Sequence, residues 1–326
     1  MLEHSSDKIR QAILQTVAYS DIFDYPLTAR EIHRYLTNVC ASLEKVVRAV
    51  EEEGIVTRVG NYFTLPGREE IVRIRMQREA HSHELIARAI QYGRVLGSLP
   101  YIRMVALTGS LAVMNVSRNE DFDYMLVTAA GRVWTARAFA LAFNRLTRLR
   151  GYTLCPNLIV SETALEWPLQ DLYSARELYQ MIPIAGMAVY RRLLAANVWA
   201  RGFLPNALNA SGDGKSSQNW HFRESRVKTR QVLEIPLNGK LGDRFEKWEM
   251  NRKIARFSRQ AGFGIETIFN AEICQGNFHH HRKWTHEAFE KKLSALAAFS
   301  SMARSDSCGE VLLSQSPGTA IGANRS

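Results

Sequence analysis

The feature that most constrains the fold of this chain is a Gly-Ser pair that is followed, ten residues later, by an Asp-Phe-Asp triplet. The pair is Gly109 and Ser110, and the acids of the triplet are Asp121 and Asp123. Apolar runs flank the segment on both sides, at residues 105–107 and 124–127. This pattern predicts a strand, a turn with a short helix, and a second strand. Because residues i and i+2 of a strand point to the same face, we expect the two carboxylates to project together.

Two carboxylates on one face of a strand suit a divalent cation. Mg²⁺ is normally held by one or two carboxylates together with the phosphates of a substrate. The turn supplies the second half of such a site, since Gly109 lets a phosphate approach the backbone closely and Ser110 offers a hydroxyl and N–H groups at the start of a helix. The alternative interpretation is a solvated acidic loop, residues 119–123, that closes a β-hairpin.

The same residues resemble the signature of the DNA polymerase beta-like nucleotidyltransferase superfamily, in particular its small bacterial members. The resemblance covers about residues 100–165 and rests on the spacing, the flanking strands and the side-chain types. It implies Mg²⁺ or Mn²⁺ as the cofactor and a nucleoside triphosphate as the substrate, with two metal ions taking part in the reaction. It also implies that Asp121 and Asp123 hold the metal and act in catalysis, and that Gly109 and Ser110 grip the β and γ phosphates.

The chain departs from the family pattern in two places. The family carries a third carboxylate on the strand after the long helix, whereas that strand here contains Asn157, and the nearest acid is Glu162 at its end. Either Glu162 reaches the site, or Asn157 stands at the third position and the second metal is weakened; we favour Asn157 as the positional match. The family's Arg after the Gly-Ser pair is also missing, and Arg118, Arg132 and Arg137 are the nearby candidates to bind the triphosphate instead.

Residues 1–78 are predicted to form a separate domain. Apolar spacing predicts a first helix over residues 8–19, Thr28 with Glu31 forms a capping box for a second helix, and Ser42 is the expected N-cap of a third helix that ends at Glu53–Gly54. A β-hairpin with its turn at Gly60–Asn61 should follow. Helices followed by a hairpin in this order resemble a winged helix-turn-helix domain.

The charge of the chain bears on its partners. A formal net charge of +10 favours polyanions such as nucleotides and nucleic acid. The third helix carries Lys45 and Arg48 but ends in Glu51–Glu53, which DNA phosphates would repel. We therefore expect weak nucleic-acid binding. The alternative is that this domain serves as an interaction or dimerisation module, or covers the nucleotide site.

The rest of the chain divides into further predicted regions. A helix over residues 69–97 should link the first domain to a nucleotidyltransferase domain, residues 79–165, and pack on its sheet. Residues 166–300 read as a helical C-terminal region, and residues 301–326, dense in Ser, Gly and Ala, as a disordered tail. The expected fold class is α/β (α+β), with a small mixed sheet between a winged helix and a helical region.

Location and activity follow as expectations. The charged N-terminus lacks the apolar core of a secretory signal, and arginines interrupt the longest apolar segments, so a cytoplasmic protein without membrane partners is expected. The predicted function is metal-dependent transfer of a nucleoside monophosphate from a triphosphate to a hydroxyl of a small molecule, an RNA or a protein. The alternative is a non-enzymatic regulator that binds nucleic acid or senses a nucleotide with a degenerate nucleotidyltransferase domain.

Overall fold

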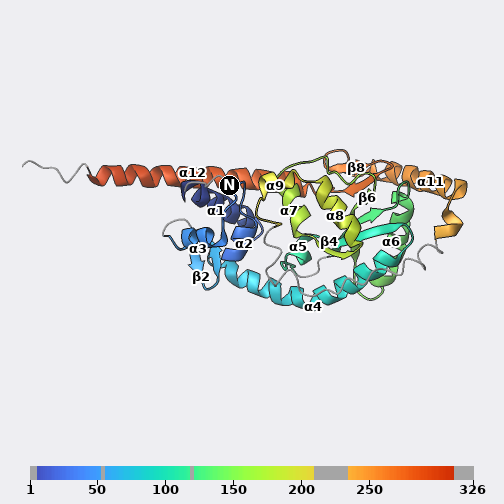
Figure 1. Cartoon of the computed structure of the whole chain (residues 1–326), viewed down its shortest axis with the longest axis horizontal. Coiled ribbons are helices and arrows are strands. Elements are labelled where there is room, and N and C mark those ends of the chain that lie inside the picture. Colours follow the sequence, from blue (N-terminus) through green and yellow to red (C-terminus); the bar gives the residue numbers. More distant parts are fainter. Residues whose placement is uncertain (1–5, 53–55, 118–120, 209–233, 312–326) are drawn as a thin grey trace, which may run out of the picture.

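The computed structural model describes residues 6–52, 56–117, 121–208 and 234–311, and the statements below refer to these residues. The chain is a mixed α/β protein in which helices surround a six-stranded mixed sheet (Figure 1). Among the helices in these ranges, none combines the length and the apolar character needed to cross a membrane.

The N-terminal unit, which we define as α1 to β3, matches the predicted order of elements. Its helices are α1 (Ser6–Asp21), α2 (Ala29–Arg34) and α3 (Leu43–Glu51). Its antiparallel sheet has the order β1 (Leu27–Thr28), β3 (Tyr62–Thr64) and β2 (Thr57–Val59). The capping box is confirmed, because Thr28 accepts from the Glu31 N–H and its own N–H donates to the Glu31 carboxylate. Ser42 caps α3, which ends at Glu51; the expected end at Glu53–Gly54 lies outside the described residues.

The predicted linking helix is α4 (Ile71–Ser98), which runs from the N-terminal unit to the central sheet (Figure 1). It packs closely on the sheet, because Gly93 leaves no room for a Cβ beside Ile184 and the Tyr124 hydroxyl donates to the Ala89 carbonyl at 2.6 Å. At its other end, Arg75 pairs with Glu31 of the N-terminal unit. The helix therefore fixes the two parts of the chain against each other.

The central sheet has the strand order β7-β4-β5-β6-β9-β8. Its strands are β4 (Ile102–Leu107), β5 (Phe122–Thr128), β6 (Leu154–Ser161), β7 (Ile182–Ala185), β8 (Thr267–Phe269) and β9 (Ile273–Gly276). Strands β5 and β6 are parallel and joined by α6 (Val133–Arg148), whereas the other neighbouring pairs are antiparallel. With α5 (Gly109–Ala112) between β4 and β5, the predicted sequence of strand, short helix, strand, long helix and strand is confirmed.

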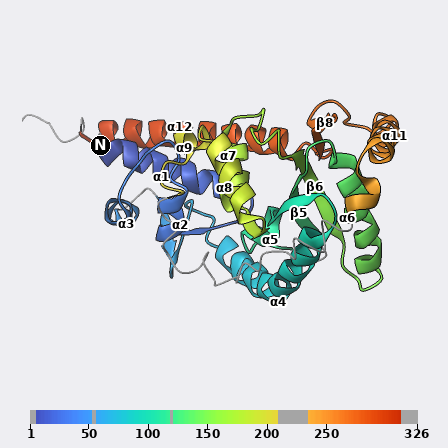
Figure 2. The same cartoon turned by 45° about the vertical axis from the view of Figure 1, so that its right-hand side comes forward.

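Helices cover both faces of this sheet (Figure 2). Along β5, Tyr124 and Leu126 pack on the side of α4 and α6, while Met125 and Val127 pack on the opposite side. The second side is covered by α7 (Leu172–Gln180), α8 (Met187–Ala196) and α9 (Ala200–Phe203). Because both faces are buried, β5 is apolar along its length after Asp123, as expected for an inner strand.

The prediction for the C-terminal part is wrong in two respects. Residues 166–300 are not purely helical, since β7, β8 and β9 from this region complete the central sheet and the boundary at 165 cuts through it. These strands have only three or four residues each, too few to show a period of two. The expected tail is also helical as far as residue 311, and residues 312–326 lie outside the described residues.

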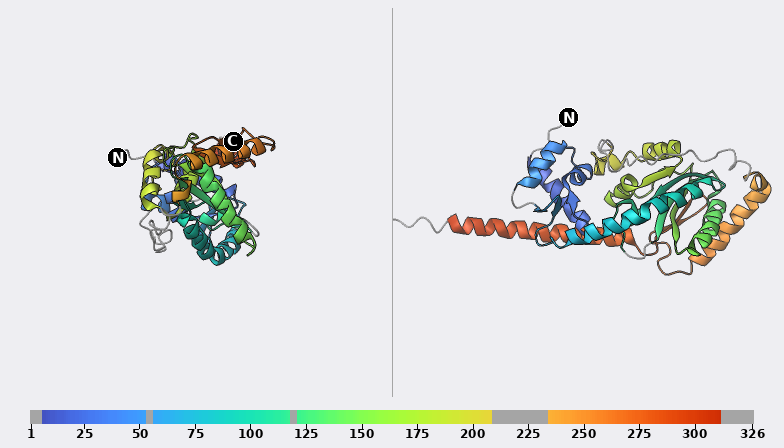
Figure 3. Two further views of the ribbon diagram at one scale, coloured as in Figure 1. Left: turned by 90° about the vertical axis from the view of Figure 1, so that its right-hand side faces the viewer. Right: turned by 90° about the horizontal axis from the view of Figure 1, so that it is seen from below.

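Two long helices complete this part of the chain. Helix α11 (Lys240–Phe257) packs against α6. Helix α12 (His281–Val311) runs along α1 and projects beyond the N-terminal unit (Figures 1 and 3). The rings of Tyr19 on α1 and Phe289 on α12 meet edge to face with centroids 5.4 Å apart, so α12 ties the end of the chain to its beginning.

Candidate functional site

A pocket of about 680 Å³ opens where the end of β4 meets the beginnings of β5 and β6. The ends of these strands form the floor of the pocket. Its walls come from α1 with the turn that follows it, from α7, and from the start of α12. Gly109, Ser110, Asp121 and Asp123 all line it, together with Asn157 of β6. The fold therefore brings these sequence-predicted residues into one cavity.

The Gly-Ser turn and the second acid are fitted to each other. Gly109 has φ = 67°, a left-handed conformation that glycine adopts without steric strain. A Cβ on Gly109 would lie 2.5 Å from Oδ2 of Asp123. The Thr108 N–H donates to the Asp123 carbonyl at 2.9 Å, which holds the turn against β5. Asp123 is partly buried and Asp121 is exposed at the pocket mouth, so the carboxylates lie at different depths.

The strand expected to carry the third carboxylate presents neutral side chains. Cys155 is the register partner of Asp123, and Asn157 lies at the irregularity that follows; both line the pocket. Burial and the nearby carboxylates of Asp123 and Asp121 raise the pKa of the Cys155 thiol to about 12. Cys155 therefore stays protonated near neutral pH and cannot replace a carboxylate as a proton acceptor.

Glu162 does not reach the site, so its prediction as a catalytic residue is wrong. It follows the last residue of β6, whereas the pocket lies at the first residues of this strand. A strand advances about 3.3 Å per residue, so Glu162 lies at the far end of β6 from the pocket. There its carboxylate lies 3.7 Å from Nη1 of Arg192, and its N–H donates to the Thr128 carbonyl. The alternative interpretation, with Asn157 at this position, agrees with the geometry.

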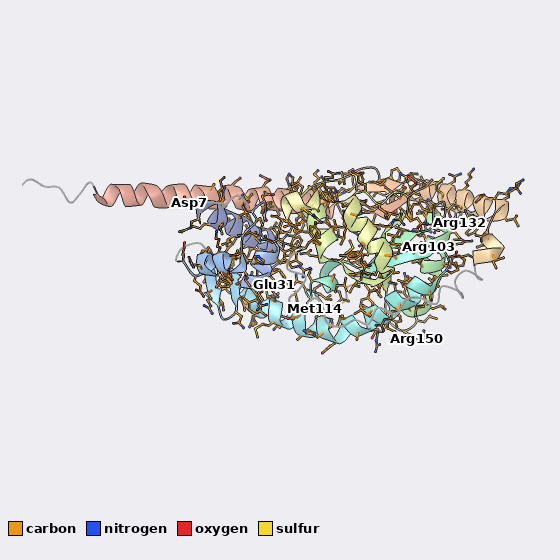
Figure 4. The ribbon with its side chains drawn as sticks, viewed as in Figure 1. Asp7, Glu31, Arg103, Met114, Arg132 and Arg150 are labelled. Atoms are coloured by element: carbon orange, nitrogen blue, oxygen red, sulfur yellow. The ribbon has the colours of Figure 1, made fainter. Side chains whose placement is uncertain are left out.

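The three arginines predicted to bind the triphosphate differ in where they lie. Arg118 lies outside the described residues. Arg132 pairs with Asp243 at 2.7 Å and lies far from Met114, the residue two places after α5 (Figure 4). Arg137 lies over the Phe257 ring, 5.1 Å from its centroid. Neither Arg132 nor Arg137 lines the pocket.

Helix α7 brings two charged residues to the pocket that sequence reasoning missed, Arg176 and Glu177. Burial raises the pKa of the Glu177 carboxyl to about 7. Glu177 and Asp123 both act electrostatically on the Tyr173 phenol, which places these groups around the same cavity. Tyr173 and Glu177 are four residues apart and therefore share a helix face, but nothing in the sequence indicates which element this face meets.

Glu266 also lines the pocket, but its carboxylate has a structural role. It accepts from the N–H groups of Arg282 and Lys283 and from the Asn277 side chain, and so caps the start of α12. Arg282 in turn binds Asp171, the N-cap of α7. These bonds join α12 to α7 and fix the wall of the pocket.

The donor set bears on the expected cofactor. Within the described residues, no group of three or more His, Cys, Asp or Glu side chains is arranged to hold a metal ion. The two carboxylates, the Ser110 hydroxyl and the Asn157 amide are hard oxygen donors, which suits one Mg²⁺ that also binds substrate phosphates. The third carboxylate that the resemblance implies for a second metal is not supplied by β6. The oxygen donors of the described pocket are therefore enough for one cation and too few for two.

Three further residues of types that bind metals, one cysteine and two histidines, lie in two different places. Cys274 is buried, and its thiol interacts with Arg137, which does not line the pocket. His279 and His281 do line it. The described residues therefore give no zinc site at these positions.

Comparisons of the chain with protein-family models, with curated proteins and with solved structures find no match.

Proposed function

We propose that this protein binds a nucleoside triphosphate with one divalent cation, Mg²⁺ or Mn²⁺, and transfers the nucleoside monophosphate to a hydroxyl of a small molecule, an RNA or a protein. The observation that carries the proposal is the fit of Gly109 against Asp123 in a pocket that also contains Ser110 and Asp121. The resemblance of this segment to the polymerase beta-like superfamily supports it. In this proposal the protein acts in the cytoplasm.

The proposed reaction gives a part to several residues of the pocket. Asp121 and Asp123 would hold the cation, which when bound neutralises charge on the phosphates. The backbone at Gly109 and the Ser110 hydroxyl would contact the phosphates. Aromatic side chains of the walls, among them Trp167 and Trp284, offer apolar surface to a base.

The transfer itself requires a proton acceptor. The acceptor oxygen forms a bond to the α-phosphorus, the bond between that phosphorus and the bridging oxygen breaks, and pyrophosphate leaves with the electron pair. The hydroxyl proton must then pass to a base. Asn157 cannot accept it, because an amide is not basic. Glu177 lines the pocket and has a pKa of about 7, close to the value that suits a general base at neutral pH.

The second candidate function is a non-enzymatic nucleotide sensor or regulator. It is favoured by one observation: Cys155 and Asn157 leave the third position of the site without a carboxylate. A sensor needs only the nucleotide-binding half of the site, whereas an enzyme also needs the proton acceptor. The two functions therefore share nucleotide binding and differ in transfer.

The test uses the full chain and a double variant, Asp121→Asn with Asp123→Asn. Calorimetry with ATP and Mg²⁺ should show binding by the wild type and its loss in the double variant, with Glu162→Gln as a control outside the pocket. Unchanged affinity in the double variant would disprove the site. Incubation with α-labelled triphosphates, Mg²⁺ and a total lysate then separates the two functions, since label transferred by the wild type alone supports the enzyme. Binding without transfer supports the sensor.

A further inference from the structure

Arg176 is a buried cation without an acidic partner. Its exposed fraction is 2%, and no ion pair joins it to a carboxylate among the described residues. Its guanidinium lies over the rings of Tyr19 and Tyr35, 4.8 and 4.6 Å from their centroids. Nη2 donates to the Tyr35 carbonyl over a long 3.4 Å, and Nε has no hydrogen-bond partner in the described structure. The residue nevertheless lines the pocket.

Arg75 is a second buried arginine, with a structural role, and it can be compared with Arg176. It is 5% exposed and also lies over two tyrosine rings, those of Tyr25 and Tyr62. Unlike Arg176, it forms two bonds to the Glu31 carboxylate, at 2.7 and 2.9 Å. Tyrosine stacking is thus common to both, and only Arg176 lacks the counter-charge.

An unpaired buried charge carries a large desolvation penalty. For Arg176 this penalty lowers the pKa, although nearby tyrosines act in the opposite direction. Its sequence neighbour Glu177 does not offset the charge, because no ion pair joins the two side chains and they point in different directions from α7. An anionic ligand in the pocket would supply the missing counter-charge.

We propose that Arg176 forms a phosphate-binding subsite of the pocket. Guanidinium groups bind phosphate through paired N–H donors, and Arg176 lines the pocket with no carboxylate of the described residues paired to its guanidinium. The phosphate comes either from the nucleotide, which rests on the proposed function, or from a phosphorylated second substrate. Since Tyr19 and Tyr35 belong to the N-terminal unit and Arg176 to α7, the bound phosphate lies at the junction of these two parts.

The first measurement is thermal unfolding of Arg176→Met without ligand. Replacing an unpaired buried charge with a shorter, unbranched apolar side chain removes the desolvation penalty and should leave the Tm unchanged or raise it. Arg34→Met is the matched control, because Arg34 lies over the same Tyr35 ring, at 5.4 Å, but does not line the pocket. A large fall in the Tm of Arg176→Met, or failure of both Arg176→Met and Arg176→Gln to fold, would show a structural role and overturn the proposal.

The second measurement is calorimetric titration with two probes. If the nucleotide supplies the phosphate, Arg176→Met should bind ATP with Mg²⁺ about tenfold or more weakly than the wild type and Arg34→Met do. If the second substrate supplies it, ATP affinity should be unchanged, and inorganic phosphate added to the ATP-saturated protein should bind the wild type but not Arg176→Met. Equal binding of both probes by the wild type and Arg176→Met would overturn the subsite.

The proposed function and the subsite fail separately. If the wild type does not bind ATP with Mg²⁺, the proposed function falls. The subsite still stands if inorganic phosphate alone binds the wild type and not Arg176→Met. If ATP binding is lost in the Asp121→Asn, Asp123→Asn variant but neither probe distinguishes Arg176→Met, the proposed function stands and the subsite falls.

Discussion

The carboxylate of Asp123 occupies the space that a side chain at Gly109 would need. The two residues come from different strand ends, yet Oδ2 of Asp123 lies only 2.5 Å from the position of a Cβ on Gly109. The turn after β4 and the beginning of β5 thus form one unit, in which the glycine backbone and the acid approach more closely than any other residue type would allow. The site is therefore sensitive to a single methyl group at Gly109.

Gly109→Ala should abolish binding of ATP with Mg²⁺. The added methyl group displaces the Asp123 carboxylate, and alanine at φ = 67° is also strained, so the protein should lose about 1 kcal/mol of stability or more. Gly60→Ala is the matched control, since Gly60 has φ = 61° with no atom within 4 Å of its Cβ position. Calorimetry and thermal unfolding of both variants check this. Normal ATP binding by Gly109→Ala would contradict the interlocked turn.

The sequence predicts the parts of this fold that depend on local signals. The strands around Gly109 and Asp123 have long apolar runs, and the caps at Thr28 and Ser42 are bonds between residues three apart, so each is visible in a short window. The site is predicted to the same extent, because Gly109, Ser110, Asp121 and Asp123 belong to that motif, whereas Asn157, on the next strand of the sheet, is found only through the resemblance.

The parts of the fold and of the site that the sequence does not predict depend on packing between distant segments. Arg176 and Glu177 reach the pocket only because α7 packs across the sheet, which no pattern around residue 176 indicates. Glu162 fails as a site residue because β6 runs its full length to Ser161 before the acid appears. The short strands β7, β8 and β9 gain their stability from pairing with longer strands rather than from their own sequences.

Glu177→Gln should change how stability depends on pH. The folded-state pKa of about 7 lies above the ordinary value of 4.5, so the folded protein holds a proton that the unfolded chain releases between these values. Stability contributed by this group is therefore present below about pH 4.5 and is lost as the pH rises to about 7. Glu177→Gln, which cannot ionise, should not show this loss.

The check for Glu177 is a series of thermal unfolding curves between pH 5 and pH 8. The Tm of Glu177→Gln should exceed that of the wild type at pH 8 by at least about 2–4 °C, the change expected for about 1 kcal/mol, and the gap should shrink toward pH 5. Glu166→Gln, at an exposed residue of the same pocket, is the control. A gap that does not vary with pH would show that Glu177 is not buried as a neutral acid.

Arg75→Met should destabilise the protein strongly, in contrast to Arg176→Met. Removing Arg75 leaves the partly buried Glu31 carboxylate without its cation, and breaking a buried pair costs about 3–5 kcal/mol. Thermal unfolding should show a fall in Tm of about 6 °C or more. Arg75→Met combined with Glu31→Gln should recover part of this loss, because no unpaired charge is left. Equal effects of Arg75→Met and Arg176→Met would show that the Glu31 pair contributes little.

Nucleic-acid binding should be weak, strongly salt-dependent and largely independent of sequence. The exposed residues of α3 mix Lys45 and Arg48 with Glu44 and Glu51, and Glu51 pairs with Arg58 of β2 at 3.5 Å, which removes one cation from any contact with phosphate. The basic excess of the chain therefore has to act from outside this helix.

A titration of duplex DNA at several salt concentrations tests this directly. A protein that neutralises Z phosphates gives a slope near −0.9Z in a plot of log affinity against log salt, so the slope counts the contacts. Lys45→Ala with Arg48→Ala should leave both the affinity and the slope nearly unchanged, because these cations share their surface with glutamates that repel phosphate. Tight, sequence-selective binding that survives moderate salt and disappears in this double variant would show that α3 reads DNA. The N-terminal unit would then be the functional centre of a regulator, and the pocket its nucleotide sensor.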